Sequence, residues 1–272
     1  MSEQGVSTVD VNGFAIRVWR KGQGRPLDFL ASPGGLPRWV PFLDHLAATR
    51  EVIAPFPGGD RGHSVLDNPL GWLVAVPQLL PQLLPQLLPQ VLRQSLVKAG
   101  LDGVDLAGSS VGASLAAEMA ALWSASVRRL SLIAPFGLLD AADPPADPWA
   151  QRPDALPGLM TADPAHWLAL KVPPEGTNSI QWPIEQTRVS EAAARLFWPL
   201  SNMRLEQRLP LIVAPTLLAW GAEDRVMPRS YAARIAGLLG GPHETQVIPG
   251  AGHLAELDRP EAVADTILQW SV

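Results

Sequence analysis

The sequence of 272 residues contains no cysteine. This absence excludes a disulfide scaffold and a thiol nucleophile, and it argues against a zinc site of the usual kind. The five histidines show no paired metal-ligand spacing such as His-Glu-x-x-His. We therefore expect no metal, and the candidate catalytic groups are hydroxyls, carboxylates and imidazoles.

Charged residues are also scarce, because Lys, Arg, Asp and Glu make up 17% of the chain. The net charge is −5 and no basic block stands out, which argues against nucleic acid as a partner. The first four residues are polar and acidic with no apolar run behind them, so no signal peptide is predicted. We expect a cytoplasmic monomer or homodimer whose partner is a small-molecule substrate.

The stretch 68–92 carries no charge and is long enough to be considered as a membrane span. Within it, residues 77–92 repeat Pro-Gln-Leu-Leu three times and end in Pro-Gln-Val-Leu. Each proline lacks a donor and presses on the carbonyl four residues back, at a cost of about 3 kcal/mol in a regular helix. We interpret the repeat as a low-complexity expansion in a bent or partly unwound connecting helix, and we predict no membrane span.

Strand and helix patterns alternate along most of the chain. Residues 7–11 and 14–19 alternate apolar and polar side chains around Asn12-Gly13, the strongest short hairpin signal. The further predicted strands are 27–31, 51–54, the short apolar run from residue 104 up to Gly108, 129–134, 215–220 and 245–248, and the clearest helices are 38–48 and 260–270. This alternation predicts a parallel sheet with right-handed crossovers.

The composition changes between residues 136 and 208, where ten prolines interrupt the helical patterns. Four tryptophans fall in this block: Trp149, Trp167, Trp182 and Trp198. The sheet pattern resumes at residue 215. The middle block is therefore interpreted as an insertion into an α/β core.

A serine between two glycines marks the most informative stretch. The run 104–107 leads into Gly108-Ser109-Ser110-Val111-Gly112, and residues 113–120 have a helical pattern. In this strand–turn–helix context, Gly-x-Ser-x-Gly forms a nucleophile elbow. The glycines allow a tight turn that exposes the Ser110 hydroxyl, and the helix directs its N–H groups at the reacting centre. Ser110 is the predicted nucleophile.

A serine hydroxyl needs an adjacent base, and that base needs a third group to orient it. His253 lies in a glycine-rich loop after the last predicted strand, and Asp224 lies in the turn after strand 215–220. The order serine, acid, histidine is the one expected for this elbow. We predict His253 as the base and Asp224 as the orienting acid. Glu223 and Asp140 stay open as alternative acids, and His63 as an alternative base.

Three segments are similar to motifs of the α/β-hydrolase superfamily: 53–59, 220–224 and 249–253. The resemblance covers the chain from about residue 7 to the end. It implies an α/β fold with a mostly parallel eight-stranded sheet, helices on both faces, and a helical cap inserted after the sixth strand. The core would comprise residues 1–135 and 213–272, and the cap residues 136–212. It also implies an acyl-enzyme mechanism without a cofactor.

The sequence departs from the family at the oxyanion hole. The family usually has His-Gly-x at the first crossover, where x donates a backbone N–H. Here the equivalent positions hold Ala31-Ser32-Pro33, and proline has no N–H to donate. The second donor, the amide of Val111, is unaffected. We predict that Gly34 replaces the missing donor, because glycine can adopt angles that turn its N–H inward.

The leading hypothesis is a serine hydrolase acting on a carboxylic ester, or a related acyl bond, of a small and largely apolar molecule. Pro33, Trp167 and Trp198 are the expected substrate-binding residues, since pockets are lined mainly by apolar and aromatic side chains. The tryptophans could instead pack the cap onto the core. A lyase or cyclase of the same fold, and a catalytically dead binding protein, are the competing hypotheses.

Overall fold

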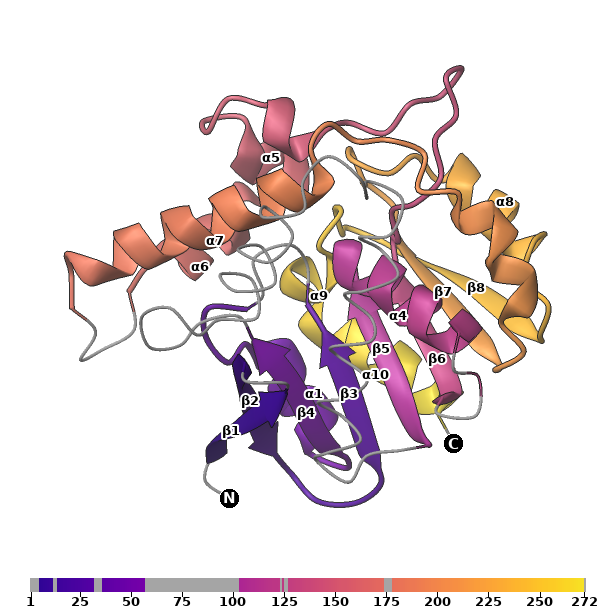
Figure 1. The fold of residues 1–272 in the computed structure, drawn as a ribbon, viewed down its shortest axis with the longest axis horizontal. Helices are drawn as coiled ribbons and strands as arrows, with labels where there is room; N and C mark the ends of the chain where they lie inside the picture. Colours follow the sequence, from indigo (N-terminus) through magenta and orange to yellow (C-terminus); the bar gives the residue numbers. More distant parts are fainter. Residues whose placement is uncertain are drawn as a thin grey trace.

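The computed structural model describes residues 5–11, 14–31, 36–56, 103–122, 124, 127–173 and 178–271. These residues form one eight-stranded sheet flanked by helices (Figure 1). The strands are β1 (Gly5–Val11), β2 (Phe14–Lys21), β3 (Pro26–Leu30), β4 (Glu51–Phe56), β5 (Val104–Ser109), β6 (Val127–Ile133), β7 (Thr216–Gly221) and β8 (His243–Ile248). The repeat at residues 77–92 lies outside the described residues.

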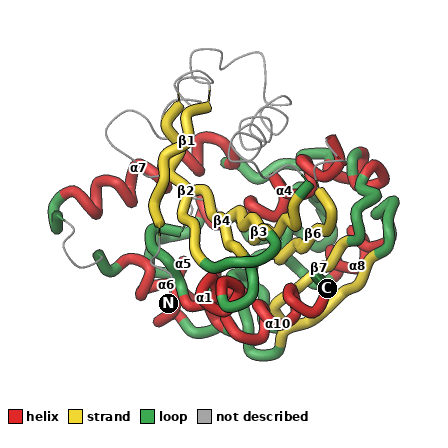
Figure 2. Tube along the Cα trace, turned by 90° about the horizontal axis from the view of Figure 1, so that it is seen from below, coloured by secondary structure: helices red, strands yellow, loops and turns green. Residues whose placement is uncertain are grey.

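The spatial order of the strands is β1-β2-β4-β3-β5-β6-β7-β8. β1 pairs antiparallel with β2, with Val11 opposite Phe14, as the Asn12-Gly13 hairpin signal predicts. β2 is also antiparallel to β4, whereas every other neighbouring pair is parallel. Figure 2 shows the strands crossing the middle of the molecule from β1 to β7. The predicted α/β-hydrolase sheet, eight-stranded and mostly parallel, is confirmed.

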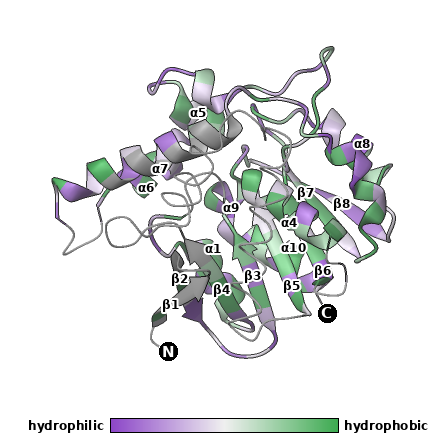
Figure 3. Ribbon diagram, in the orientation of Figure 1, coloured by the Kyte–Doolittle hydropathy of each residue, from purple (hydrophilic) through white to green (hydrophobic). Residues whose placement is uncertain are grey.

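Helices cover both faces of the sheet, as predicted. They are α1 (Pro41–Ala47), α4 (Val111–Leu122), α8 (Ser230–Ala236), α9 (Ala255–Asp258) and α10 (Pro260–Trp270). Side chains alternate between the faces along each strand. Leu106 and Leu218 pack in a cluster with α4 and α8, whereas Ala107 and Leu217 pack in a second cluster with α1 and α10. Figure 3 shows that the central strands are largely hydrophobic.

Most predicted boundaries agree with the structure to within three residues, and the differences have local causes. The helix predicted from residue 38 begins at Pro41, because a proline at the first position gives up no intrahelical hydrogen bond. β8 begins two residues before its predicted start. It is the edge strand and, of its six residues, only Ile248 is buried, so its first residues carry no apolar pattern.

The segment between β6 and β7, residues 136–212, is called the inserted segment below. It contains α5 (Leu156–Met160), α6 (Pro164–Lys171), α7 (Gln181–Phe197) and three short 3-10 helices at Pro148–Ala150, Leu205–Gln207 and Leu209–Leu211. α7 runs unbroken over 17 residues, because Pro183 lies in its first turn where proline is tolerated. In Figure 1, α5, α6 and α7 lie above the carboxyl ends of the parallel strands. Among the helices described, none is long and apolar enough to cross a membrane.

Candidate active site

Ser110 occupies the turn between β5 and α4. Its φ of 57° places a non-glycine residue in the left-handed region, a conformation that costs on the order of 1–3 kcal/mol. The backbone is crowded here, since a Cβ added at Gly112 would lie 2.1 Å from the carbonyl oxygen of Leu30. The Ser110 N–H donates to the carbonyl of Ile133 at 2.8 Å. The sharp turn predicted from the two glycines is therefore present and held by β3 and β6. The prediction that the turn exposes the Ser110 hydroxyl is wrong, because Ser110 is buried.

His253 lies in the loop between β8 and α9, and its side chain is fully buried. Its Nε2 lies 2.9 Å from the Ser110 Oγ, and its Nδ1 lies 3.0 Å from Asp224 Oδ2. The ring of Phe136 meets the imidazole edge-on, with 5.3 Å between centroids. Ser110, His253 and Asp224 form a continuous hydrogen-bonded triad, assembled from loops that lie far apart in the sequence.

Asp224 follows β7, and its side chain is fully buried. Its Oδ1 accepts the N–H groups of Val226 and Met227 at 2.8 and 2.9 Å, which directs Oδ2 at the imidazole. An ionised carboxylate can only accept, so His253 Nδ1 carries the proton and Nε2 presents its lone pair to the serine hydroxyl. This arrangement can take a proton from Ser110.

The two alternative acids lie elsewhere. Glu223 is exposed to solvent. Asp140 is half-exposed, accepts from Arg234 at 3.3 Å, and also accepts the N–H of Ala142. Among the described carboxylates, Asp224 is the one hydrogen-bonded to the imidazole of His253. The alternative base, His63, lies outside the described residues.

Val111 is the first residue of α4 and is buried beside the triad. At this helix position the N–H has no intrahelical acceptor and is free to bind a developing negative charge. Pro33 and Gly34 lie outside the described residues, so the replacement of one donor by Gly34 stays a prediction.

The tryptophans of the inserted segment differ in their surroundings. Trp198 is 56% exposed, and Trp167 is partly buried with the Lys171 ammonium 4.8 Å from its ring centroid. Between described residues, no ring contact or hydrogen bond joins either indole to His253. Trp149 lies closer to the triad, since its ring centroid is 6.4 Å from that of Phe136, which contacts His253.

Sequence reasoning missed three residues around the triad. Phe136 lies two residues after the predicted strand 129–134, a position at the carboxyl edge that could have identified it. Glu256 is a carboxyl in an otherwise apolar stretch three residues after His253. Burial raises the pKa of Glu256 to about 7, opposed by the Ser109 hydroxyl and the charge of His253. No sequence signal marked the third residue, Asp258.

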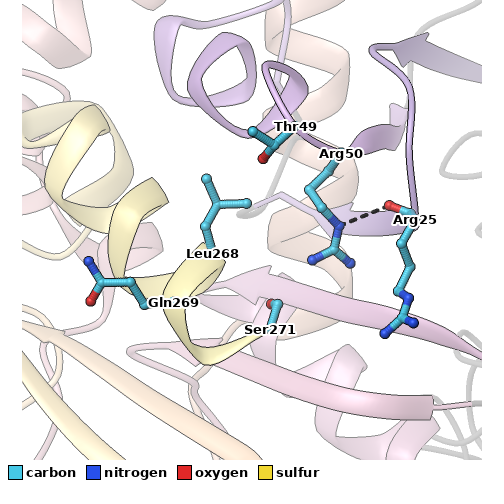
Figure 4. A pocket seen from close by; sticks show the side chains of 6 residues that line it. All are labelled: Arg25, Thr49, Arg50, Leu268, Gln269 and Ser271. Atoms are coloured by element: carbon cyan, nitrogen blue, oxygen red, sulfur yellow. Dashed lines mark hydrogen bonds between the residues drawn. The ribbon is translucent and has the colours of Figure 1, made fainter.

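A cavity of about 580 Å³ lies at the other edge of the sheet, where the strands begin (Figure 4). Its lining residues are Arg25, Thr49, Arg50, Leu268, Gln269 and Ser271. The Arg50 guanidinium already donates to the carbonyl of Arg25 at 2.9 Å, drawn as a dashed line. This cavity is separate from the triad. In the part of the chain that the structure describes, no cluster of three or more His, Asp or Glu could hold a metal ion.

Comparison with known proteins places this geometry in context. A sequence model of the alpha/beta hydrolase family matches residues 35–266. The dihydrolipoyllysine-residue acetyltransferase component of an acetoin cleaving system, from Pseudomonas putida, is 29% identical to this chain. The alignment covers 96% of the chain and 68% of that protein.

Two solved structures illustrate the likeness of fold. A bacterial membrane phospholipase A matches with a TM-score of 0.72 and 22% identity, over 98% of this chain and 86% of its own. The 2-hydroxy-6-oxo-6-phenylhexa-2,4-dienoate hydrolase of Rhodococcus sp. strain RHA1 matches with a TM-score of 0.72 and 16% identity, over 99% of both chains. At these identities the matches concern the fold alone.

Proposed function

The chain belongs to the alpha/beta hydrolase family, and from this premise we propose that it is a serine hydrolase. Its substrate is a small, largely apolar molecule with a carboxylic ester or a related acyl bond. One observation carries this proposal: the Ser110 hydroxyl, the His253 imidazole and the Asp224 carboxylate are joined by hydrogen bonds of 2.9 and 3.0 Å in a buried site.

In the first step, Ser110 Oγ attacks the acyl carbon while its proton passes to His253 Nε2. The positive charge that develops on the imidazole is stabilised by Asp224, whose position is fixed by two backbone N–H groups. The imidazolium then returns the proton to the leaving alcohol, and the acyl group stays bound to Ser110. This sequence needs a base with a free Nε2 lone pair, which the hydrogen bond at Nδ1 provides.

In the second step, a water molecule gives one proton to His253 as it attacks the acyl-enzyme. The acid is released and Ser110 recovers its proton. In both steps the former carbonyl oxygen of the substrate becomes negatively charged. We assign the hydrogen bonds to this oxygen to the N–H groups of Val111 and Gly34. Two such donors stabilise the oxyanion more strongly than water does, because they are oriented before the reaction begins.

The inserted segment, residues 136–212, is the proposed cap over the site. Its residue Phe136 presents aromatic surface to His253, and Trp149 lies against Phe136, which supports an apolar substrate. Pro33, Trp167 and Trp198 are proposed as further contacts to the substrate. The names of the two similar structures, a phospholipase and a hydrolase of a phenyl-substituted dienoate, agree with this choice.

The decisive experiment replaces Ser110 by alanine. Turnover of p-nitrophenyl esters should fall by roughly 10⁴-fold or more, because the nucleophile is lost and the rest of the site stays in place. Labelling by a fluorophosphonate should disappear at the same time. Ser109→Ala is the matched control, since Ser109 is an adjacent buried serine whose hydroxyl is not part of the hydrogen-bonded triad. Activity above a few per cent in Ser110→Ala, with Ser109→Ala unaffected, would sink the proposal.

A second candidate is acyl transfer to an acceptor other than water. The observation that favours it is the similarity over 96% of this chain to a protein named as an acetyltransferase component. The same acyl-enzyme would form on Ser110, and an alcohol or thiol would then replace the water. Product analysis with added alcohols and thiols distinguishes the two reactions, because transfer yields a new ester or thioester instead of the free acid.

A further inference from the structure

Asp258, the last residue of α9, is a buried carboxylate that accepts hydrogen bonds from two separate segments. Its side chain is 1% exposed. Oδ2 accepts the N–H of Gly252 at 2.8 Å and that of Ala162 at 2.7 Å. Oδ1 lies 2.7 Å from His166 Nδ1 and accepts the N–H of Asp163 at 3.3 Å. One carboxylate thus joins the loop that carries His253 to the start of α6 in the inserted segment.

The loop on either side of His253 is held from both directions. The preceding residue, Gly252, is bound by Asp258, and the following residue, Leu254, donates its N–H to the carbonyl of Met160 at 2.8 Å. Packing is close as well, since a Cβ added at Gly252 would lie 2.6 Å from the backbone nitrogen of Ala162. The backbone of His253 has little freedom to shift while these contacts are made.

We propose that Asp258 is a positioning residue, which fixes His253 by clamping its loop to the inserted segment. This inference rests on the proposed function, in which His253 is the base. The imidazole must stay within hydrogen-bond reach of both Ser110 and Asp224, and its backbone anchor determines whether it does. A displacement of about 1 Å in a reacting group can cost on the order of a hundredfold in rate.

The chemistry of the four donors explains why a carboxylate stands at this position. A carboxylate offers about four acceptor sites on two oxygens and has no hydrogen of its own. An asparagine would keep one acceptor oxygen and turn an NH₂ group toward one pair of donors. With its oxygen on Gly252 and Ala162, the NH₂ group could donate to His166 Nδ1, and the anchor of the His253 loop would survive. An alanine would leave all four donors without this acceptor.

The test measures kcat and KM on a p-nitrophenyl ester for Asp258→Ala, Asp258→Asn and a control. The control is Asp163→Ala, which removes the N-cap acceptor of the same α6 helix and leaves the bond between Asp258 and Gly252 in place. We expect kcat of Asp258→Ala to fall on the order of a hundredfold, with KM within about threefold of the parent. Asp258→Asn should retain kcat within about fivefold, and the control within about twofold.

Proton NMR on histidine-labelled protein gives a readout that does not need turnover. The hydrogen-bonded Nδ1 proton of His253 should give a low-field signal that is broadened or lost in Asp258→Ala and kept in Asp163→Ala. If Asp258→Ala does not fold, Gly252→Ala perturbs the same contact and should lower kcat with KM little changed. Equal kcat in Asp258→Ala and Asp163→Ala, with the His253 signal intact in both, overturns the proposal. Failure of the proposed function would appear differently, as full activity in Ser110→Ala.

Discussion

The carboxyl edge and the amino edge of the sheet both bury charged groups, but they differ in how completely the polar atoms of these groups are hydrogen-bonded. At the carboxyl edge, Asp224 and His253 are fully buried, and each of their polar atoms has a partner in the triad or the backbone. At the amino edge, Asp105 Oδ2 accepts from Arg50 and Arg128, whereas its Oδ1 has no hydrogen-bond partner among the described residues. Complete partnering of the Asp224 and His253 side chains thus coincides with the path along which protons must move.

The amino-edge cluster joins strands. Arg50 donates to the carbonyls of Arg25 and Pro26 at the start of β3, and to Asp105 on β5. Arg128 on β6 donates to the same carboxylate and to the carbonyl of Ser271 near the end of the chain. This geometry holds the sheet and the last helix together, and the hydroxyl of Ser271 in this cluster donates to the carbonyl of Ile267 and not to a histidine. Burial of charge alone therefore does not identify the candidate active site, whereas a directed chain of donors and acceptors does.

The largest expected effect lies at the carboxyl edge. Asp224→Asn should lower kcat by about 10⁴-fold, because the amide no longer holds the proton on His253 Nδ1 or stabilises the imidazolium. Glu223→Gln is the matched control in the same turn and should leave kcat nearly unchanged. Steady-state kinetics on a p-nitrophenyl ester measures both. A mild Asp224→Asn beside a severe Glu223→Gln or Asp140→Asn would mean that the acid has been misassigned.

The amino edge should respond in stability instead of rate. Asp105→Asn leaves the buried Arg50 guanidinium without its counter-charge, which should lower the free energy of unfolding by about 3–5 kcal/mol. Asp44→Asn removes an exposed partner of Lys21 and should cost about 1 kcal/mol or less. Urea denaturation reports both values. If folded Asp105→Asn lost as much kcat as Asp224→Asn, the amino edge would contribute to catalysis as well as to stability, contrary to this prediction.

Glu256 tests whether a carboxyl near the triad titrates in the neutral range. Its folded-state pKa is raised from 4.5 to about 7 by burial, so the folded protein keeps this proton where the unfolded chain has lost it. Stability therefore falls as pH rises from about 4.5 to 7, by up to about 3 kcal/mol. Glu256→Gln should flatten this part of the stability profile and gain most above pH 7. Denaturation curves at pH 5 and 8, measured in parallel for the parent and the variant, show whether Glu256 causes this pH dependence of stability. Equal pH dependence in both proteins would show that Glu256 does not contribute.

The smallest expected effect concerns the oxyanion donors. If Gly34 supplies the N–H that Pro33 lacks, Gly34→Pro should lower kcat at least about tenfold, and Pro33→Gly should change it little. Loss of a full donor costs about 10²–10³ in other enzymes, which sets the upper range. Both variants are compared on one ester. A rise in kcat of about a hundredfold in Pro33→Gly would mean that the natural site is poor at acyl transfer. The hypothesis of a lyase or cyclase would then be favoured.

Local pattern was enough to predict much of the fold. The antiparallel pairing of β1 with β2 and the strand–turn–helix around Ser110 are encoded within about ten to twenty residues each, and both appear as expected. The pairing of Ser110, His253 and Asp224 followed from their order and from the shared carboxyl edge of parallel strands. These signals are strong because a turn or a strand end restricts which residue types fit.

Contacts between distant segments could not be predicted in the same way. Asp258 meets Ala162 and His166 across more than 90 residues, and nothing near Asp258 in the sequence specifies that approach. Trp149 lies next to Phe136, although Trp167 and Trp198 were the tryptophans chosen as substrate contacts. In the inserted segment many side chains are exposed, so periodicity says little about which face meets the core. Such contacts depend on the position and orientation in which the inserted segment packs against the sheet.

The placement of the triad residues along the chain also affects the order in which the site forms during synthesis and folding. His253 follows β8, one of the two outermost strands, which pairs with β7, and β7 in turn pairs with β6. During synthesis, Ser110 emerges more than 140 residues before His253, and the nascent chain contains the elbow long before it contains a base. Long-range parallel pairing is slow to form, because the loops between the strands must close first. Recovery of ester turnover after refolding should therefore lag behind the return of helical circular dichroism, and it marks the arrival of the final strand.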